Sequence, residues 1–273
     1  MPELPEVETV VRYLRPHLEG RTVNRFEAWW PKVTDPMPAE VFAQMATNRV
    51  IHAIHRRGKY ILWQLDRGFI HIHLRMTGQL VVLDGADNDD RHHVTAEFDL
   101  SDEMTVLFRD MRKFGRVGYL EDIAPLEAKL GPEPLSPQFT PDLLHRLLAD
   151  HRRQIKPLLL DQGFIAGLGN IYVDEALFLA RVHPGTPASS LTLEQAQILH
   201  HAIQGILTES IGLDGTTIIN FSFGDGGRGR FRDMLQVFRR EGEPCPVCGT
   251  PLEKIRIAQR GTHLCPQCQV LDS

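Results

Sequence analysis

The chain has 273 residues, of which 42% are hydrophobic and 24% charged, a composition typical of a globular protein. Its formal net charge of -5 argues against a uniformly basic surface of the kind that neutralises nucleic-acid phosphates. Basic residues nevertheless gather in two segments, 109–116 and 226–240, so a nucleic-acid partner remains compatible with the charge distribution. No apolar run approaches the about 20 residues that span a bilayer, and the acidic N-terminal segment does not resemble a signal peptide. We therefore expect an intracellular protein.

The N-terminal half predicts one helix followed by a β-rich region. Apolar residues recur at helical spacing over 2–18, with Pro2 and Pro5 in the first turn, where a missing N–H costs little. From 22 to 120 the pattern changes to short β segments, and an Asp66-Arg67-Gly68 turn indicates a hairpin. The strands expected in this region are 60–65, 69–74, 94–98, 104–108 and 117–120. Several strands separated by turn signals favour a sandwich or a barrel.

The C-terminal half predicts helices. Residues 131–138 carry three prolines and a glycine and are the best candidate for a linker. Thr192 and Gln195 have the spacing of a capping box at the start of a long helix. The helices expected beyond the linker are 141–150, 155–161, 170–180 and 192–210. A glycine-rich stretch, 221–230, then precedes a final segment that contains every cysteine of the chain.

The cysteines form two Cys-x2-Cys pairs with 16 residues between them: Cys245, Cys248, Cys265 and Cys268. This spacing is typical of a zinc ribbon, in which two tight turns present four thiolates to one tetrahedral metal. Two disulfides are the alternative, but such pairs in an intracellular chain favour zinc. Because four protein ligands leave no open coordination position, we expect one structural Zn2+ ion that holds the intervening hairpin in shape.

The first residues combine a proline with two nearby carboxyl groups. Once Met1 is removed, Pro2 carries a secondary α-amine with a pKa near about 8, compared with about 10.4 for lysine. A neutral amine can attack the C1′ carbon of a sugar and form an iminium. Glu3 and Glu6 share one helix face, where one carboxyl can act as a general acid. The alternative is structural, because acidic residues and proline both favour the first turn of a helix.

A series of motifs carries a family resemblance along the whole chain: MPELPEVETV, RRGKYILWQL, HLRMTGQL, RDMRKFG, IKPLLLDQGFIAGLGNIYVDEALF and the cysteine-containing end. With them the sequence resembles the bacterial formamidopyrimidine-DNA glycosylases. The resemblance implies an α+β fold in three parts. These are an N-terminal catalytic β-sandwich with a helix laid against it (1–132), a helical helix–two-turn–helix domain (133–218), and a lesion-capping loop with a zinc-finger β-hairpin (219–273).

The same resemblance implies an activity and a partner. The activity is that of a bifunctional DNA glycosylase and AP lyase of base excision repair. It removes 8-oxoguanine and formamidopyrimidines and then cleaves the abasic strand by β,δ-elimination. The implied partner is damaged double-stranded DNA. We expect a monomer with no membrane attachment and no small-molecule cofactor, located in the cytoplasm and at the nucleoid when bound to DNA.

The resemblance also assigns catalytic roles to Pro2, Glu3, Lys59 and Arg260. Pro2 forms the Schiff base with C1′, and Glu3 donates the proton that helps to open the sugar ring. Lys59 serves β-elimination, whereas Arg260 serves δ-elimination and contacts a phosphate. From the residues alone, Lys59 reads equally as a solvated charge at the start of a strand, and Arg260 as a general phosphate anchor.

Three residues match those that fill the space left by a flipped nucleotide: Met76, Arg112 and Phe114. Flipping costs a few kcal/mol of stacking, and inserted apolar or planar side chains restore part of it. For Met76 the alternative is a place in the core, because methionine on an alternating strand is usually buried.

Three further residues are expected to contact DNA: Arg91, Arg152 and Asn170. Asn170 follows Gly167-Leu168-Gly169 and is predicted to be the N-cap of a helix whose N-terminus binds phosphate. Arg91 stands where the family commonly has histidine, and Arg152 where lysine is usual. The glycine-rich segment 215–229 matches the loop that closes over the damaged base, and its glycines suit a mobile lid.

Two alternative functions remain open. One is a related glycosylase of the endonuclease VIII type, which acts on oxidised pyrimidines, although Leu4 argues against it because that branch usually has glycine there. The other is a non-catalytic zinc-ribbon DNA-binding protein, which would need neither the Pro2-Glu3 start nor Lys59.

Overall fold

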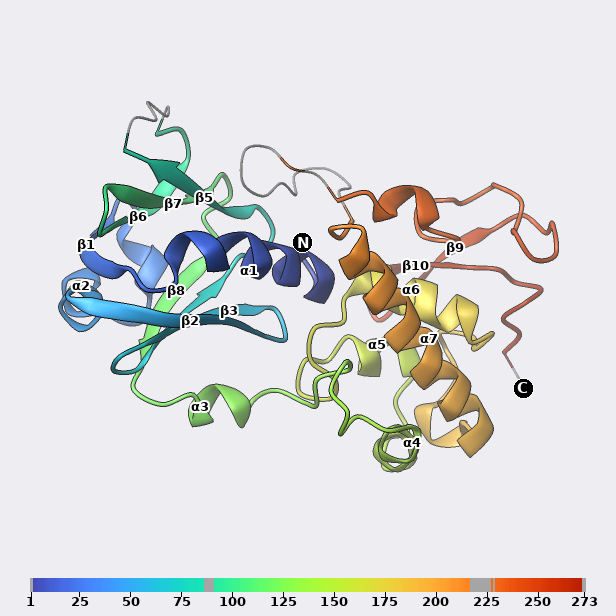
Figure 1. Cartoon of the computed structure of the whole chain (residues 1–273). Coiled ribbons are helices and arrows are strands. Elements are labelled where there is room, and N and C mark those ends of the chain that lie inside the picture. The colour runs from blue at the N-terminus through green and yellow to red at the C-terminus, as the bar shows by residue number, and fades with distance from the viewer. Residues whose placement is uncertain (1, 86–90, 217–226, 228, 272–273) are drawn as a thin grey trace. The chain divides into compact units, whose positions relative to one another are not determined.

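The computed structural model describes residues 2–85, 91–216, 227 and 229–271 (Figure 1). The predicted glycine-rich stretch 221–230 and the capping loop 215–229 therefore lie largely outside the described residues. The chain divides into two compact units. Unit 1 comprises Met1–Glu127 and Leu213–Arg230, and unit 2 comprises Ala128–Gly212 and Phe231–Ser273.

Unit 1 is built on an antiparallel sheet of eight strands among its described residues, in the order β5-β7-β6-β1-β2-β3-β4-β8. The strands are β1 (Thr22–Ala28), β2 (Arg49–Arg57), β3 (Tyr60–Leu65), β4 (Phe69–His73), β5 (Gly78–Asp84), β6 (Val94–Leu100), β7 (Met104–Asp110) and β8 (Arg116–Leu120). The five predicted strands are confirmed to within two residues at each end. β1, β2 and β5 lie in the region where only a general β pattern was predicted.

The sheet folds over on itself into a sandwich. The rings of Trp63 on β3 and Phe98 on β6 lie 4.9 Å apart, although β1 and β2 separate these strands in the sheet order. Neighbouring strands are about 4.8 Å apart, so only a folded sheet can bring these rings into contact. Both side chains are fully buried, and each such burial contributes about 1.5–3 kcal/mol.

The helices of unit 1 cover this core. They are α1 (Leu4–Leu18), η1 (Pro31–Thr34), α2 (Ala39–Ala46) and α3 (Ala124–Glu127). Figure 1 shows α1 running along the sheet, where its buried apolar face packs against β2 and β3. The helix α2 was not predicted from the sequence. It buries Phe42, whose ring lies 4.4 Å from Phe26 and 6.2 Å from Phe98.

The hairpin β3–β4 confirms the turn predicted at residues 66–68. Gly68 has a φ of +74°, a backbone conformation that side chains other than glycine rarely adopt. A Cβ at this position would also overlap the hydroxyl of Tyr119 on β8. The turn therefore needs glycine for its backbone and for its packing.

Unit 2 consists of helices and one hairpin. Its elements are α4 (Pro141–Ala149), α5 (Ile155–Leu159), α6 (Asn170–Leu179), η2 (Ala188–Ser190), α7 (Leu193–Gly212), η3 (Phe231–Met234), β9 (Glu253–Ile257) and β10 (Arg260–Leu264). The four predicted helices are confirmed, with ends that shift by at most two residues. The capping box at α7 is confirmed by the amide of Thr192 donating to Gln195 Oε1 at 2.9 Å, and that of Gln195 donating to Thr192 Oγ1 at 3.2 Å.

The proline-rich segment 131–138 is irregular, as its composition predicts, but it packs within unit 2. The amide of Gly131 donates to the carbonyl of Gln162 at 2.9 Å, and that of Ala166 donates to the carbonyl of Pro132 at 3.1 Å. The division between the units falls earlier, between Glu127 and Ala128. In the described part of the chain, no helix has both the length and the apolar character needed to span a bilayer.

Candidate active site and metal centre

The N-terminal end of α1 carries the predicted nucleophile. The helix begins at Leu4 with Glu3 at the N-cap position, so Pro2 lies just before the helix instead of inside its first turn, while Pro5 remains in that turn. The carboxylate of Glu6 accepts hydrogen bonds from the amides of Glu3 and Thr216, both at 2.7 Å. The Glu3 side chain in turn accepts the amide of Glu6, so the two carboxyls form a capping box that holds both at the start of α1.

Lys59 lies in the two-residue turn between β2 and β3. Its exposed fraction is only 5%, so the alternative of a solvated charge at a strand start is wrong. Arg56 fastens this turn to α1, because its Nε donates to Glu8 at 3.1 Å and a terminal nitrogen donates to the carbonyl of Gly58 at 3.1 Å. The structure thus anchors the turn that carries Lys59 against the helix that follows Pro2.

His73 is a buried histidine of β4 near Lys59 that was not singled out from the sequence. Burial, with the positive charges of Arg75 and Lys59, lowers the pKa of His73 to about 3. Its Nδ1 accepts the amide of Arg75 at 3.0 Å, so the neutral ring carries its proton on Nε2. A neutral imidazole beside a buried lysine is a hydrogen-bond donor that keeps its protonation state at neutral pH. The alternation of β4 places His73 on the face opposite Ile70 and Ile72, so the pattern signals neither its burial nor its proximity to Lys59.

Met76, Arg112 and Phe114 all lie on exposed turns of unit 1. Met76 is 41% exposed and Phe114 is 47% exposed, so the core alternative for Met76 is wrong. Met76 lies between β4 and β5, and the other two residues lie between β7 and β8. The guanidinium carbon of Arg112 lies 4.7 Å from the centroid of the Phe114 ring. Exposed apolar side chains of this size on turns are available for insertion into another molecule.

The predicted contact residues Arg91 and Arg152 have different surroundings. Arg91 forms an ion pair of 2.8 Å with Glu97, a residue that is 5% exposed on β6. Arg152 is exposed between α4 and α5 in unit 2. Both remain candidates for phosphate contact. To contact a phosphate, Arg91 would have to give up its ion pair with Glu97 or share its guanidinium between the two groups.

Asn170 does not have the predicted N-cap role. Gly169 occupies the N-cap position of α6, and Asn170 is the first residue of the helix. Its side-chain nitrogen instead donates to the carbonyl of Gly261 at 3.0 Å, and Nζ of Lys156 donates to the same oxygen at 2.9 Å. Gly261 follows Arg260, which is the exposed first residue of β10. Asn170 and Lys156 therefore fix the backbone next to Arg260.

A buried acidic residue of α6 completes this attachment. Asp174 and Lys156 are both 0% exposed, and their charged atoms lie 2.6 Å apart. The second oxygen of Asp174 accepts the amide of His263 on β10 at 2.9 Å. The adjacent Glu175 accepts three backbone amides, those of 236–238, although burial still raises its pKa. Two neighbouring carboxyls thus bind the C-terminal segment to α6.

Replacing Asp174 with asparagine is expected to destabilise unit 2 by about 3–5 kcal/mol, because Lys156 is left as a buried charge without its counterion. Urea unfolding followed by a probe within unit 2 measures this loss. The matched control is Glu243→Gln, which breaks the more exposed pair of Glu243 with Arg240, 2.7 Å apart. The control should cost less than about 1 kcal/mol. Equal losses in both variants would contradict the assigned role.

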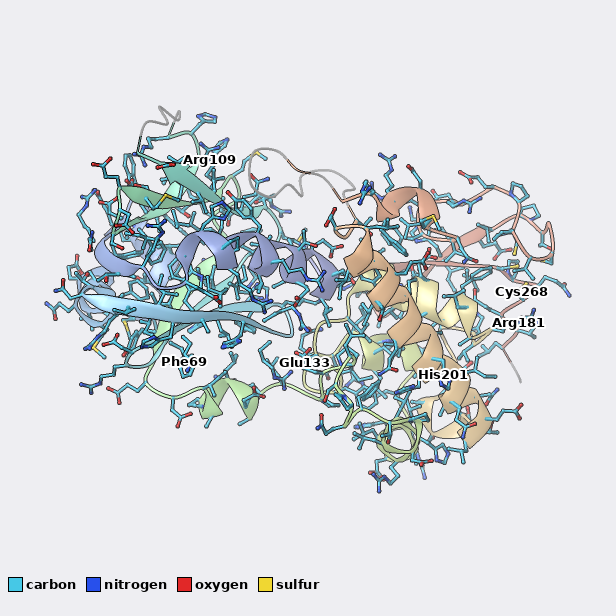
Figure 2. All side chains as sticks on the ribbon, in the orientation of Figure 1. Phe69, Arg109, Glu133, Arg181, His201 and Cys268 are labelled. Carbon is cyan, nitrogen blue, oxygen red and sulfur yellow. The ribbon has the colours of Figure 1, made fainter. Side chains whose placement is uncertain are left out.

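The four cysteines converge at one point of unit 2. Their Sγ atoms all lie within 4.8 Å of one another, and all four are free thiols. Two of the separations are 3.9 Å for Cys245 with Cys268 and 3.5 Å for Cys248 with Cys265. Figure 2 labels Cys268. A set of four thiols at this spacing fits one tetrahedral Zn2+ and no other ligand is needed, so the ion is structural.

The closeness of these thiols also affects their ionisation. Burial, together with hydrogen bonds to the neighbouring thiols, raises the pKa of Cys268 to about 12. In contrast, hydrogen bonds from Thr250 lower the pKa of Cys248 to about 6. Four thiolates this close would repel one another, and the charge of a divalent ion would offset that repulsion and so favour the deprotonated form of its ligands.

Comparisons with known proteins agree with this geometry over the whole chain. The formamidopyrimidine-DNA glycosylase N-terminal domain matches residues 1–117, and the H2TH domain of the same glycosylases matches residues 130–222. The zinc finger found in FPG and IleRS matches residues 242–270. The matched parts correspond to the sheet of unit 1, the helices of unit 2 and the hairpin β9–β10 between the two cysteine pairs.

Individual relatives cover nearly the full length. A formamidopyrimidine-DNA glycosylase of Chloroflexus aurantiacus is 48% identical, over 99% of this chain and 98% of the relative. One of Geobacillus kaustophilus is 42% identical, over 98% and 100%.

Solved structures agree as well. MutM in complex with DNA containing carbocyclic 8-oxo-G has a TM-score of 0.90 at 37% identity, covering 98% of this chain and 100% of that one. Lactococcus lactis Fpg in complex with abasic-site DNA has a TM-score of 0.89 at 36% identity, covering 98% and 99%. The chain therefore belongs to the formamidopyrimidine-DNA glycosylase family.

Proposed function

We propose that this protein is a bifunctional DNA glycosylase and AP lyase that excises oxidised purines from double-stranded DNA. The observation that carries the proposal is the start of α1, where Pro2 precedes a helix N-terminus beside a buried Glu3. The positive end of the helix dipole lowers the pKa of an adjacent amine and so increases its neutral, nucleophilic fraction. A cytoplasmic location, at the nucleoid when bound to DNA, is part of this proposal because its substrate is DNA.

The reaction uses the residues of unit 1 in sequence. The Pro2 nitrogen attacks C1′ of the damaged nucleotide and gives up its proton, while the bond from C1′ to the base breaks and the base leaves with that electron pair and takes up a proton. Proton donation from Glu3 to the ring oxygen opens the sugar, and the nitrogen lone pair forms an iminium with C1′. The iminium acidifies the C2′ proton, whose loss expels the 3′ phosphate in β-elimination, a step that we assign to the environment of Lys59.

The remaining residues would hold the DNA. Arg260 would contact a phosphate and assist loss of the 5′ phosphate, while Arg91, Arg152 and Asn170 would contribute further contacts to the backbone. Met76, Arg112 and Phe114 would fill the space of the flipped nucleotide. The proposal also divides the chain by function into a catalytic domain (1–132), a helix–two-turn–helix domain (133–218) and a capping loop with a zinc finger (219–273).

Borohydride trapping tests the function directly, because reduction of the iminium joins enzyme and DNA permanently. We expect a covalent complex with a duplex that contains 8-oxoguanine opposite cytosine, and none with the undamaged duplex. A complex that forms preferentially with an oxidised pyrimidine would favour the endonuclease VIII type. Binding of all duplexes with no covalent complex on any would favour the non-catalytic zinc-ribbon protein.

A further inference from the structure

Two turns of unit 1 together present three large exposed apolar side chains. The first turn, 74–77, joins β4 to β5 and carries Met76. The second, 111–115, joins β7 to β8 and carries Met111 and Phe114. The exposed fractions of these side chains are 41%, 54% and 47%, respectively. Short exposed turns are ordinarily mobile, so their side chains need a restraint if they are to act together.

A buried carboxylate at the end of β7 provides that restraint. Asp110, the last residue of β7, is 1% exposed. Its Oδ1 accepts the amide of Arg112 at 3.1 Å, and its Oδ2 accepts the amide of Gly115 at 2.6 Å. The same carboxylate therefore binds the beginning and the end of the second turn.

Thr77 extends the restraint to the first turn. Its hydroxyl donates to Oδ1 of Asp110, and the hydroxyl oxygen accepts the amide of Arg112 at 3.2 Å. Thr77 precedes Gly78, which pairs with Asp110 in the register of β5 and β7. The residue that follows Met76 is thereby bound to Asp110 and to the beginning of the second turn.

The backbone at the far end of the second turn is also held closely. A Cβ at Gly115 would overlap the ring of Phe108 and would lie 3.1 Å from Oδ2 of Asp110. Only glycine lets this amide approach the carboxylate and the buried ring together. Hydrogen bonds to an ionised acceptor are about twice as strong as neutral ones, so Asp110 is well suited to order both turns.

We propose that Asp110 and Thr77 are positioning residues that join the two turns into one rigid wedge before DNA binds. The proposal rests on the proposed function, in which this wedge replaces a flipped nucleotide. Ordering of flexible side chains and loops on binding reduces affinity, and a wedge that is already ordered avoids this loss. The benefit is greatest where a stacked, paired base must be displaced, and smallest where the base is already missing.

The test compares two substrates in single-turnover reactions. One duplex contains 8-oxoguanine opposite cytosine, and the other contains an abasic site opposite cytosine. Thr77→Val keeps the shape of the side chain and removes the hydroxyl. We expect it to slow excision of the paired lesion about tenfold, the effect of one lost hydrogen bond to a charged group, and to slow abasic-strand cleavage by about twofold or less.

The matched control is Thr105→Val at the opposite end of β7. Thr105 also donates to a carboxylate on a neighbouring strand, that of Asp99, at 3.3 Å. It should leave both rates unchanged. Asp110→Asn should reproduce the selective loss of Thr77→Val, because an amide nitrogen facing Gly115 cannot accept its N–H.

Two outcomes overturn the positioning role. Equal slowing of both substrates by Thr77→Val would indicate a general structural defect, and no slowing of either would remove the role altogether. Phe114→Ala then distinguishes failure of this inference from failure of the proposed function on which it rests. If Phe114→Ala slows only the paired lesion while Thr77→Val does not, positioning alone fails. If neither variant affects the paired lesion although trapping persists, the wedge role in the proposed function fails as well.

Discussion

Protein that retains Met1 is expected to form no trapped covalent complex with DNA and to lose at least about 10³-fold in excision rate. With Met1 attached, the nitrogen of Pro2 belongs to a peptide bond, and its lone pair is delocalised into the carbonyl group. An amide nitrogen cannot attack C1′. The measurement is borohydride trapping on an 8-oxoguanine duplex, with the mass of the protein confirming the state of its N-terminus.

The control compares the same chain before and after cleavage of the peptide bond between Met1 and Pro2. Protein made with its initiator methionine retained is subjected to borohydride trapping before and after treatment with a methionine aminopeptidase. Removal of Met1 should allow the covalent complex to form. DNA binding before treatment should persist, because the contacts of the folded units do not involve the amine. An active enzyme whose mass includes Met1 would contradict the Pro2 mechanism, and Lys59, buried in its turn, would be the next nucleophile to test.

Local patterns predicted most of the secondary structure. The hairpin at 66–68 has a glycine that its turn requires, and the capping box at Thr192 uses side chains three residues apart, so both depend on nearby residues alone. The helix α2 was missed because it is short, and what stabilises it is tertiary packing. Phe42 is buried against rings of β1 and β6, which nothing in residues 39–46 reveals.

The site residues were located by motif, but their surroundings were not predictable. The pattern at 167–170 suggested an asparagine cap, yet the Asn170 side chain is directed to Gly261, 91 residues away in sequence. Similarly, the pairing of Lys156 with Asp174 and the burial of Lys59 depend on long-range packing. A single sequence identifies residue types and local spacing, whereas desolvation and partners arise only when distant segments meet.

Removal of zinc is expected to unfold the hairpin β9–β10 and to leave the sheet of unit 1 intact. The apolar cluster around the metal site is small: Phe178, Val237, Cys245, Leu252 and Cys265. So small a cluster cannot hold a two-stranded hairpin by itself, and zinc binding of about 10 kcal/mol or more at neutral pH supplies the difference. DNA affinity should fall because Arg260 begins β10, while a trapped complex should still form at high protein concentration because the Pro2 amine lies in unit 1.

Hydrogen exchange measured before and after chelation tests this expectation. Amides of 253–264 should lose protection when zinc is released, amides of 60–65 should keep theirs, and added zinc should restore the first set. The buried pair of Lys156 with Asp174 is the competing source of stability, because it binds the backbone of 261 and 263 directly. If the hairpin stays protected without zinc but loses protection in the Asp174→Asn variant, then the ion pair and not the metal maintains the position of Arg260.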